Sequence, residues 1–498
     1  MRSALLAVLG AGLLVAGLAA PVAAQPASRG TATPTAVPTP TVSGPVTGGN
    51  GISLLSTSFD LASVGYSEQE YFLAGTARAF TSSQPLTTDG RWHVQPASSA
   101  PYKTRIVVYR PTSAKHFNGN VVVEWMNVSA GADSAVDWIA GHTSLIRDGA
   151  AYVGVSAQAV GVQGGSGAVG SIAGGGIRAA DPARYGSLSH PGDSYSYDIF
   201  SQAGLVARGH LRPDPLAGLA VHHVVAAGES QSAFRMVTYI DAVQPLDHVF
   251  DGFLVHSTWA TGAPLSQAPQ PSIVVPRGTM IRTDLGVPVL VFETETDLLN
   301  GYASVSQPDT SGLRVWEVAG TAHADAYTAG FGFGDTGNGQ AERMLLDASA
   351  VGGGPLSCSQ PINLGPAYLV LSTAMHDLQA WVATGTAPPR APRLAVTAGP
   401  PVTIARDAHG NAVGGIRTPL LDAPAATLTG DPNAGGTFCT LFGTTTPFDA
   451  ATLAALYPTH AAYVTAFDRA TDQAVHAGFL LAADAANLKA AASAAGTG

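Results

Sequence analysis

Short apolar runs alternate with segments of helical hydrophobic spacing through the middle of the chain. Each run is rich in valine, leucine and phenylalanine and ends at a polar or glycine-containing turn. Strands buried on both faces of a parallel sheet have this continuous apolar pattern, whereas half-exposed strands alternate apolar with polar positions. The pattern therefore predicts an α/β protein with a mostly parallel central sheet flanked by helices, with strands at 120–124, 151–162, the first part of 221–240, 249–256, 287–292 and 313–318.

The chain before these runs has a different pattern. Residues 71–80 and 102–109 have the composition of strands and are separated by turn-forming residues, which predicts a β-rich N-terminal part of the core. Residues 1–24 begin with a single arginine, continue as an apolar stretch and end in small residues, which predicts a signal peptide cleaved after Ala24. Residues 25–50 are rich in proline, threonine and glycine, which predicts a semi-extended linker. We therefore expect a secreted or extracytoplasmic protein.

The core predicted from these patterns covers residues 51–324, and residues 325–498 are interpreted as an accessory region packed on it. This region combines helical spacing at 367–383 with short strands and turns and a final alanine-rich helical part. It also contains the two cysteines of the chain, Cys358 and Cys439. Exported proteins form disulfides, so a single bond between them is predicted, with two buried free thiols as the alternative.

The charge of the chain narrows the set of partners. It has 24 Lys and Arg residues against 34 Asp and Glu residues, a net charge of -10 and no basic run. Nucleic acids and anionic membranes are bound by basic surfaces, so neither is expected as a partner. No stretch after residue 24 has the pattern of a transmembrane helix, so no stable membrane insertion is expected after signal cleavage.

The stretch 221–240 carries the first candidate for chemistry. Its apolar run ends at Gly228-Glu229-Ser230-Gln231-Ser232, after which the spacing becomes helical. A strand that turns sharply into a helix through Gly-x-Ser-x-small is a nucleophile elbow: a strained turn lifts the serine hydroxyl out of the sheet. The next backbone N–H is then free to face an oxyanion. We therefore predict Ser230 as a nucleophile and the N–H of Gln231 as an oxyanion donor.

Two later strand ends supply an acid and a histidine in a fixed order. The run 287–292 ends at Glu293-Thr294-Glu295-Thr296-Asp297, and the run 313–318 is followed by a small turn and His323. The order serine, acid, histidine, each just after a strand, distinguishes one serine-hydrolase scaffold from the others. We predict His323 as the general base and then acid, oriented by Asp297 as first choice or Glu295 as the alternative.

Other strand ends suggest the rest of a site. The loop after 120–124 is where the second oxyanion donor lies on such scaffolds, which points to the N–H of Asn127 or Val128. The alternative is that this segment is a strand-to-helix loop with no role in oxyanion binding. Four further side chains are predicted to line a substrate pocket: Trp125, Tyr185, His190 and Trp259. For Tyr185 and His190 a structural turn is the alternative.

These segments together resemble the bacterial exported "alpha/beta hydrolase domain-containing" proteins, a branch of the α/β-hydrolase superfamily. The resemblance rests on VVVEWMNVSAG, AYVGVSAQ, DPARYGSLSHPGDSYSYDIFSQAG, AAGESQSA, VPVLVFETETD and EVAGTAH, and it covers roughly residues 55–490. GESQS departs from the commoner GxSxG at its last position. The resemblance implies the α/β-hydrolase fold, a Ser-acid-His site and esterase-like chemistry, without a particular substrate.

The expected activity is therefore that of a secreted serine hydrolase that cleaves carboxylic esters through an acyl-enzyme on Ser230. Small-molecule, lipid and polymer esters all fit, and the mechanism requires no metal or organic cofactor. Three alternatives use the same residues differently: an acyltransferase or a serine peptidase with the same triad, and a non-catalytic secreted binding protein on the same scaffold.

Overall fold

The computed structural model describes residues 36–167, 176–347, 357–397 and 399–495. Contacts divide the chain into two units, Met1–Thr33 and Pro34–Gly498, and every described residue belongs to the second unit. The predicted signal peptide, with its cleavage site, and residues 25–35 of the predicted linker lie outside the described residues.

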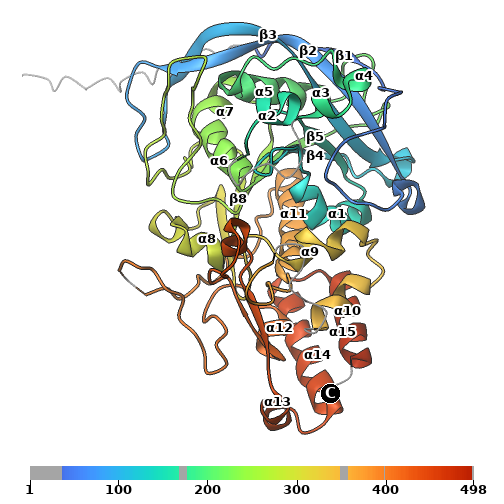
Figure 1. The fold of residues 1–498 in the computed structure, drawn as a ribbon, viewed down its shortest axis with the longest axis vertical. Helices are drawn as coiled ribbons and strands as arrows, with labels where there is room; N and C mark the ends of the chain where they lie inside the picture. The colour runs from blue at the N-terminus through green and yellow to red at the C-terminus, as the bar shows by residue number, and fades with distance from the viewer. Residues whose placement is uncertain (1–35, 168–175, 348–356, 398, 496–498) are drawn as a thin grey trace, which may run out of the picture. The chain divides into compact units, whose positions relative to one another are not determined.

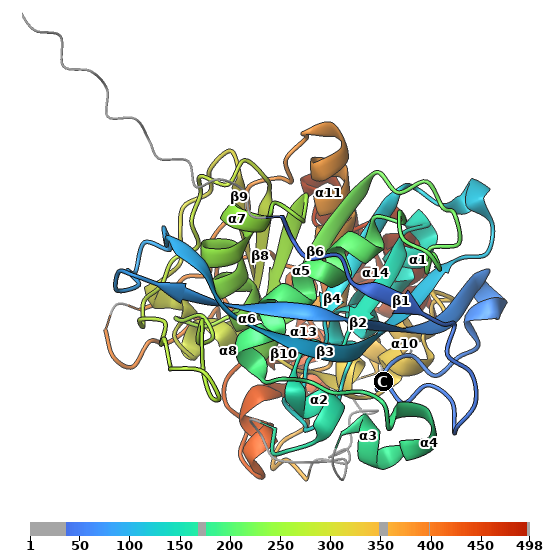
Figure 2. The same ribbon diagram turned by 90° about the horizontal axis from the view of Figure 1, so that it is seen from above.

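Nine strands of the described residues form one sheet, in the order β1-β2-β3-β5-β4-β6-β7-β8-β9 (Figure 2). Pairing is antiparallel from β1 to β5 along this order and parallel from β5 to β9. Strands β4, β5, β7, β8 and β9 are buried at every position, which explains their continuous apolar sequences. The strands span Thr41–Ser43 (β1), Tyr66–Ser82 (β2), Val94–Pro111 (β3), Asn120–Trp125 (β4), Ala151–Val155 (β5), His223–Glu229 (β6), Gly252–His256 (β7), Val289–Thr294 (β8) and Leu313–Val318 (β9).

The N-terminal part is rich in β-structure, as predicted. Its main feature is the long hairpin of β2 and β3, with 17 and 18 residues. Strand β1 lies inside the stretch that the sequence predicts to be a linker, and it pairs antiparallel with β2. Residues 41–43 therefore form the edge strand of the sheet. Threonine and valine at 41–42 favour a strand, but their pairing partner, β2, lies too far along the chain to be recognised from the local sequence.

Helices cover both faces of the sheet (Figure 1). On one face α1 and α11 lie side by side, and their apolar residues form one buried cluster with β6, β7, β8 and β9. On the other face α5 and α6 pack with the same strands in a second cluster. This arrangement confirms the predicted fold class. The α-helices of the core are α1 (Val136–Asp148), α2 (Ala159–Gln163), α3 (Ile177–Ala180), α4 (Pro182–Tyr185), α5 (Ser196–Ala207), α6 (Gln231–Thr238), α7 (Gln244–Asp247), α8 (Glu295–Leu299), α9 (Ala326–Ala329), α10 (Gln340–Leu346) and α11 (Ala367–Thr384).

Helix α11 follows residue 324, where the sequence places the end of the core, yet it covers the central strands. Twelve of its eighteen residues are buried, on more than one side of the helix. A helix with this distribution packs between two partners instead of lying on a surface. The packing therefore joins the segment of α11 to the central sheet. The chain beyond residue 384 reaches the sheet too, where Ile416 forms an isolated bridge with Val318 of β9.

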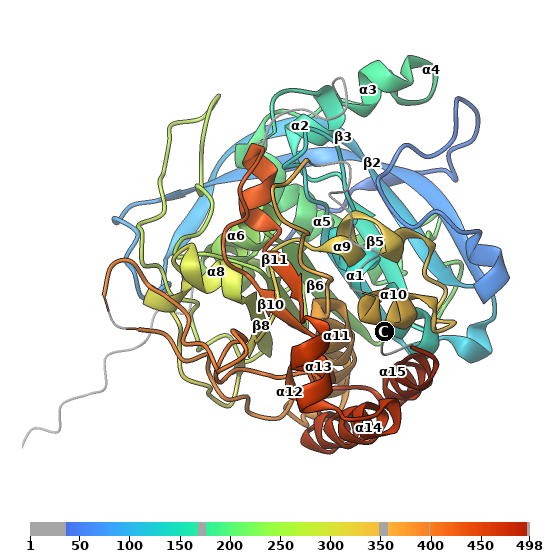
Figure 3. The same cartoon turned by 60° about the horizontal axis from the view of Figure 1, so that its bottom comes forward.

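The C-terminal part adds a two-stranded antiparallel sheet and a group of helices (Figure 3). Helices α14 and α15 pack against each other, and α15 also contacts α10. These elements are α12 (Pro419–Asp422), β10 (Ala426–Thr429), β11 (Thr444–Pro447), α13 (Ala450–Leu456), α14 (His460–Ala477) and α15 (Ala482–Ala494).

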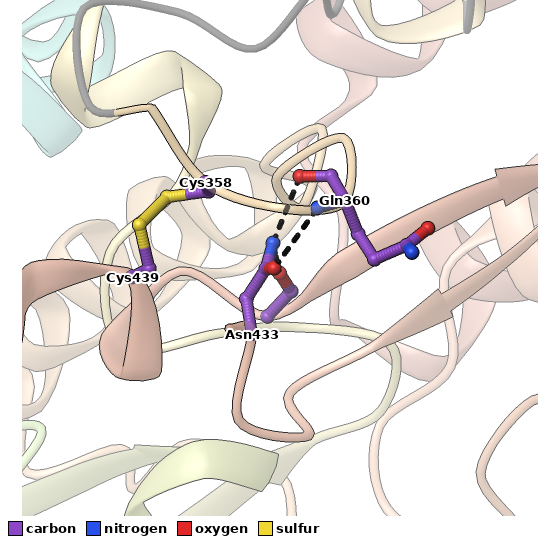
Figure 4. The surroundings of a disulfide bond; sticks show 5 residues. Cys358, Gln360, Asn433 and Cys439 are labelled. Carbon is purple, nitrogen blue, oxygen red and sulfur yellow. Dashed lines mark hydrogen bonds between the residues drawn. A yellow bond between two sulfur atoms is a disulfide. The ribbon is translucent and has the colours of Figure 1, made fainter. Parts of the chain in front are cut away.

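A disulfide joins two segments of this C-terminal part (Figure 4). Cys358 and Cys439 are bonded, 81 residues apart in the sequence, which confirms the predicted pair. Beside the bond, the side-chain amide of Asn433 donates to the backbone oxygen of Gln360 at 2.9 Å and accepts from its N–H at 3.1 Å. The covalent link and this amide pair hold the same two segments together. Separately, no helix among the described residues is long and apolar enough to cross a membrane.

Candidate active site

Ser230 lies in the sharp turn between β6 and α6. Its backbone has φ 59° and ψ -121°, a region that L-residues rarely adopt. A side chain at Gly228 would place its Cβ 2.9 Å from the backbone oxygen of Ser232, so only glycine fits two residues before the serine. Ser232 is itself fully buried, where a small residue is needed. The strand-turn-helix geometry is that of the nucleophile elbow.

His323 joins Ser230 to an acid. Its Nε2 lies 2.8 Å from the Oγ of Ser230, and its Nδ1 lies 2.6 Å from Oδ1 of Asp297. The other carboxylate oxygen of Asp297 accepts the N–H of Thr294 at 2.8 Å and its hydroxyl at 2.6 Å. A carboxylate on Nδ1 fixes the tautomer whose Nε2 is free to accept the serine proton.

The electrostatics of this arrangement favour an ion pair. Burial acts to raise the pKa of Asp297, but the charge and the hydrogen bond of His323, with those of Thr294, hold it below its usual value. Burial acts to lower the pKa of His323, but the charge and hydrogen bond of Asp297, and then the charge of Glu229, raise it to about 9. The imidazole is therefore a stronger base than a free histidine.

Glu295, the alternative acid, is hydrogen-bonded elsewhere. Its Oε1 accepts the N–H of Gly320 at 2.6 Å, and its Oε2 accepts Nη1 of Arg406 at 2.7 Å and the N–H of Gly430 at 3.0 Å. These contacts connect the loop before His323 to the C-terminal part. The geometry thus places Asp297, and not Glu295, against the imidazole.

The predicted oxyanion donors occupy different positions. Gln231 is the first residue of α6, so its N–H has no partner within the helix. The N–H of Asn127 already donates to the backbone oxygen of Ser134 at 3.0 Å. The next N–H in that loop, of Val128, has no recorded hydrogen bond among the described residues. Of the two predicted positions in the loop after β4, Val128 is therefore the one with an available donor.

One acidic residue beside the serine was not predicted from the sequence. Glu229, the last residue of β6, is buried and accepts Nδ2 of Asn127 at 2.8 Å. Its Oε1 lies 3.5 Å from Nε2 of His323. Burial raises the pKa of Glu229 to about 7, against the lowering effects of His323 and then His256. Glu229 is the first x of the Gly-x-Ser-x-small motif, so the motif does not specify which residue type stands there.

Of the four side chains predicted to line a pocket, Trp259 lies nearest the site. Its ring centroid is 6.1 Å from that of His323 and 5.5 Å from that of Phe234. Trp125 is fully buried, packs between aromatic rings of α5 and donates its Nε1–H to Gln158 at 3.0 Å.

Tyr185 and His190 lie in structural networks. The Tyr185 hydroxyl is 3.1 Å from a carboxylate oxygen of Glu70 and 3.3 Å from Arg105, in a buried ion-pair cluster. The Nε2 of His190 is hydrogen-bonded to the backbone oxygen of Ala157 at 2.9 Å, and the ring is buried. Both side chains are therefore held by hydrogen bonds within the fold, as is usual for a buried aromatic side chain with a polar group.

A family model described as an alpha/beta hydrolase domain matches residues 42–490 of this chain. A search among curated proteins finds no match.

Solved structures of several esterases are similar in part. One is an esterase from Rhizomucor miehei, with 10% identity, 63% of this chain and 85% of that chain covered, and a TM-score of 0.29. A glucuronoyl esterase from Solibacter usitatus has 11% identity, with 57% and 83% covered and a TM-score of 0.28. A glucuronoyl esterase from Teredinibacter turnerae T7901 has 12% identity, with 50% and 70% covered and a TM-score of 0.25. These values are too low to transfer a substrate to this chain.

Proposed function

The chain belongs to the alpha/beta hydrolase domain family, and on this premise we propose that it is a serine hydrolase that cleaves carboxylic esters through an acyl-enzyme on Ser230. The observation that carries the proposal is the pair of contacts made by His323: 2.8 Å from Nε2 to the serine oxygen and 2.6 Å from Nδ1 to Asp297. A buried chain of nucleophile, base and orienting acid, on a strained elbow, is an arrangement that activates a serine.

Acylation follows from these contacts. The Oγ of Ser230 attacks the ester carbonyl while Nε2 of His323 takes its proton, and the carbonyl π electrons move onto the oxygen. The N–H groups of Gln231 and Val128 then hold the oxyanion. Losing one such donor typically costs about 100- to 1000-fold in kcat. The tetrahedral intermediate collapses, and the alcohol leaves with the proton from His323.

Deacylation repeats the sequence with water. His323 takes a proton from the attacking water, the acid is released, and the proton returns to Ser230. Throughout, Asp297 remains ionised and stabilises the imidazolium, because its carboxylate is fixed by Thr294 and has a depressed pKa. All atoms of this cycle come from the ester, water and the protein. Small-molecule, lipid or polymer esters remain the proposed substrates.

We also place the protein outside the cytoplasm. The disulfide between Cys358 and Cys439 supports this, because such bonds persist in oxidising compartments. Expression of the full chain with a C-terminal tag, followed by fractionation and mass determination of the mature N-terminus, tests both export and cleavage after Ala24. Retention of an uncleaved protein in the cytoplasm would contradict this assignment.

A fluorophosphonate probe tests the proposed activity directly, because it reacts with activated serines whatever the natural ester is. We expect covalent labelling of the purified wild type and none of Ser230→Ala or His323→Ala. Ser372→Ala is the matched control, since this serine is buried in α11 on a layer that does not carry the site. It should keep full labelling. A folded wild type that is not labelled would overturn the proposal.

A further inference from the structure

We propose that Glu229 is a positioning residue that holds the oxyanion loop and the imidazole of His323 against one carboxylate, and that its charge stabilises the imidazolium formed during catalysis. This inference rests on the proposed function, because it concerns how the same serine and histidine work. Glu229 ends β6 and directly precedes Ser230, so any movement of its side chain is tied to the elbow.

The first contact is with the loop after β4. The side-chain amide of Asn127 donates to Oε2 of Glu229 at 2.8 Å and lies 3.2 Å from its backbone oxygen. The amide oxygen of Asn127 accepts the N–H of Ser129 at 2.7 Å. Val128 lies between these two anchored residues. The carboxylate therefore fixes the distance between the Val128 N–H and the elbow, where the N–H of Gln231 lies.

The second contact is with the proton-carrying nitrogen. Oε1 of Glu229 is 3.5 Å from Nε2 of His323, the atom that accepts the serine proton. When the imidazole is neutral, as it must be to take the serine proton, Nε2 is an acceptor and gains nothing from a carboxylate. Once Nε2 carries the proton, it faces an opposite charge in a buried site, where such an interaction is weakly screened. The carboxylate therefore favours the protonated imidazole over the neutral one.

The surroundings of Glu229 keep its carboxyl near the point of ionisation. Its register partner on β7 is His256, whose Nδ1 is 2.8 Å from Oδ1 of Asp137 in α1. Burial raises the pKa of Glu229 to about 7; the charges of His323 and His256 lower it, Asp137 raises it, and the hydrogen bond from Asn127 lowers it. At neutral and alkaline pH a large fraction is therefore ionised.

The sign of the expected pH effect follows from the base role of His323. Catalysis needs the neutral imidazole, so kcat/KM falls as the pH drops through the pKa of His323. Burial acts to lower the pKa of His323, the charge and hydrogen bond of Asp297 raise it, and the charge of Glu229 raises it further, to about 9. Removing the charge should lower the pKa of His323, and the acid limb should move to lower pH.

The experiment compares wild type with Glu229→Gln, which keeps the shape and an acceptor for Asn127 but removes the charge. We measure kcat/KM for p-nitrophenyl acetate from pH 5 to 10, and the rate of fluorophosphonate labelling over the same range. The half-maximal pH should fall by about one unit, and the alkaline plateau should fall by up to about tenfold. Thermal unfolding verifies that the variant is folded.

Glu124→Gln is the matched control. Glu124 is buried at the end of β4 and accepts N–H groups at the start of α1. Burial and then the charge of Asp137 raise its pKa well above the usual value. Its hydrogen bonds go to the start of α1 and to the hydroxyl of Tyr152, so the change to glutamine alters a buried carboxyl that does not bond His323 or Asn127. Its pH profile should match that of wild type.

The outcomes separate the two proposals. A wild type without labelling or ester hydrolysis overturns the proposed function. An active wild type whose Glu229→Gln variant has an unshifted acid limb overturns only the role of Glu229. If Glu229→Gln does not fold, Asn127→Leu tests the same role: loss of the donor raises the pKa of Glu229, and the acid limb should again move down. An unshifted limb in that variant also overturns it.

Discussion

The two sides of the active site are held in different ways. On the serine side, Ser230 is placed by the elbow itself, and its N–H donates to the backbone of the neighbouring strand at His256, 2.9 Å away. On the histidine side, the loop 319–326 after β9 is fixed from outside the sheet. The difference shows that Ser230, the proposed nucleophile, is positioned by the sheet, whereas His323, the proposed base, depends on the chain that follows it.

The contacts on the histidine side come from residues far along the sequence. Asn363, which is fully buried, donates its side-chain amide to the backbone oxygen of Gly320 at 3.0 Å and accepts the N–H of Ala326 at 2.9 Å. Three further hydrogen bonds link the loop and α8 to the same region: Ala319 N–H to Ile416 O at 2.9 Å, Ala324 N–H to Leu441 O at 3.0 Å, and Thr296 Oγ1 to Gly430 O at 2.7 Å. The C-terminal part is therefore a clamp on the segments that carry His323 and Asp297, the proposed base and acid.

The largest effect is expected where the two acids are compared. Asp297→Asn leaves the imidazole without its anion and favours the wrong tautomer, so kcat should fall by about 10⁴-fold. Glu295→Gln removes the charge that pairs with Arg406 on the clamp and one acceptor oxygen, but no contact with His323, and kcat should fall less than about tenfold. Steady-state kinetics on p-nitrophenyl acetate measure kcat for the two variants and test this difference. Equal losses in both variants would mean that the clamp and the triad acid cannot be separated.

The sequence located the strand ends and favoured Asp297, but it left Glu295 open as the alternative acid. Both Asp297 and Glu295 follow the apolar run 287–292, and α8 begins at Glu295, with Asp297 in a capping box with Thr294. That turn points Asp297 to His323 and Glu295 to Gly320. Glu295 and Asp297 are only two positions apart in the first turn of α8, so their side chains leave the helix in different directions. A pattern of apolar positions does not predict these directions.

Contacts between segments far apart in the chain could not be predicted from the sequence either. The pairing of Glu229 with Asn127 spans 102 residues, and the contacts of Asn363 carry no motif. Trp125 and Tyr185 were predicted as pocket residues, and both are fully buried in the structure. Ser230 and His323 could be proposed from the sequence because the chemistry expected of them needs a turn directly after a strand, which is a local pattern.

The second effect concerns the disulfide of the clamp. The bond closes a loop of 81 residues, for which chain entropy predicts a contribution of about 4 kcal/mol. The double variant Cys358→Ser with Cys439→Ser should therefore unfold at a lower denaturant concentration. Near its transition we expect activity to be lost before the secondary structure of the central sheet, because the clamp holds His323. Simultaneous loss, followed by circular dichroism and ester hydrolysis in urea, would contradict a separate clamp.

A smaller effect is expected from a single clamp contact. Asn363→Ala leaves the Gly320 oxygen without its donor, which should lower the free energy of unfolding by about 1–3 kcal/mol and also reduce kcat. Asn411→Ala is the matched control: Asn411 is fully buried and bonds Ala426 and Leu428 within the C-terminal part, but not the loop 319–326. It should destabilise the protein with kcat unchanged. If both variants keep kcat, the clamp stabilises the fold without positioning His323.

The smallest effect is expected at Trp259, which lies where the two sides meet. Its ring contacts Phe234 of the elbow helix and approaches His323 of the clamped loop. We expect it to form an apolar wall for the acyl or alcohol group, so Trp259→Phe should raise KM by about fivefold, the equivalent of roughly 1 kcal/mol of lost contact, with kcat retained. Trp381→Phe, on α11 and distant from the elbow, is the control and should change neither constant. Kinetics on p-nitrophenyl butyrate separate the two parameters. A fall in kcat with unchanged KM would instead show that Trp259 orients the imidazole, which would extend the clamp on His323 across to the serine side.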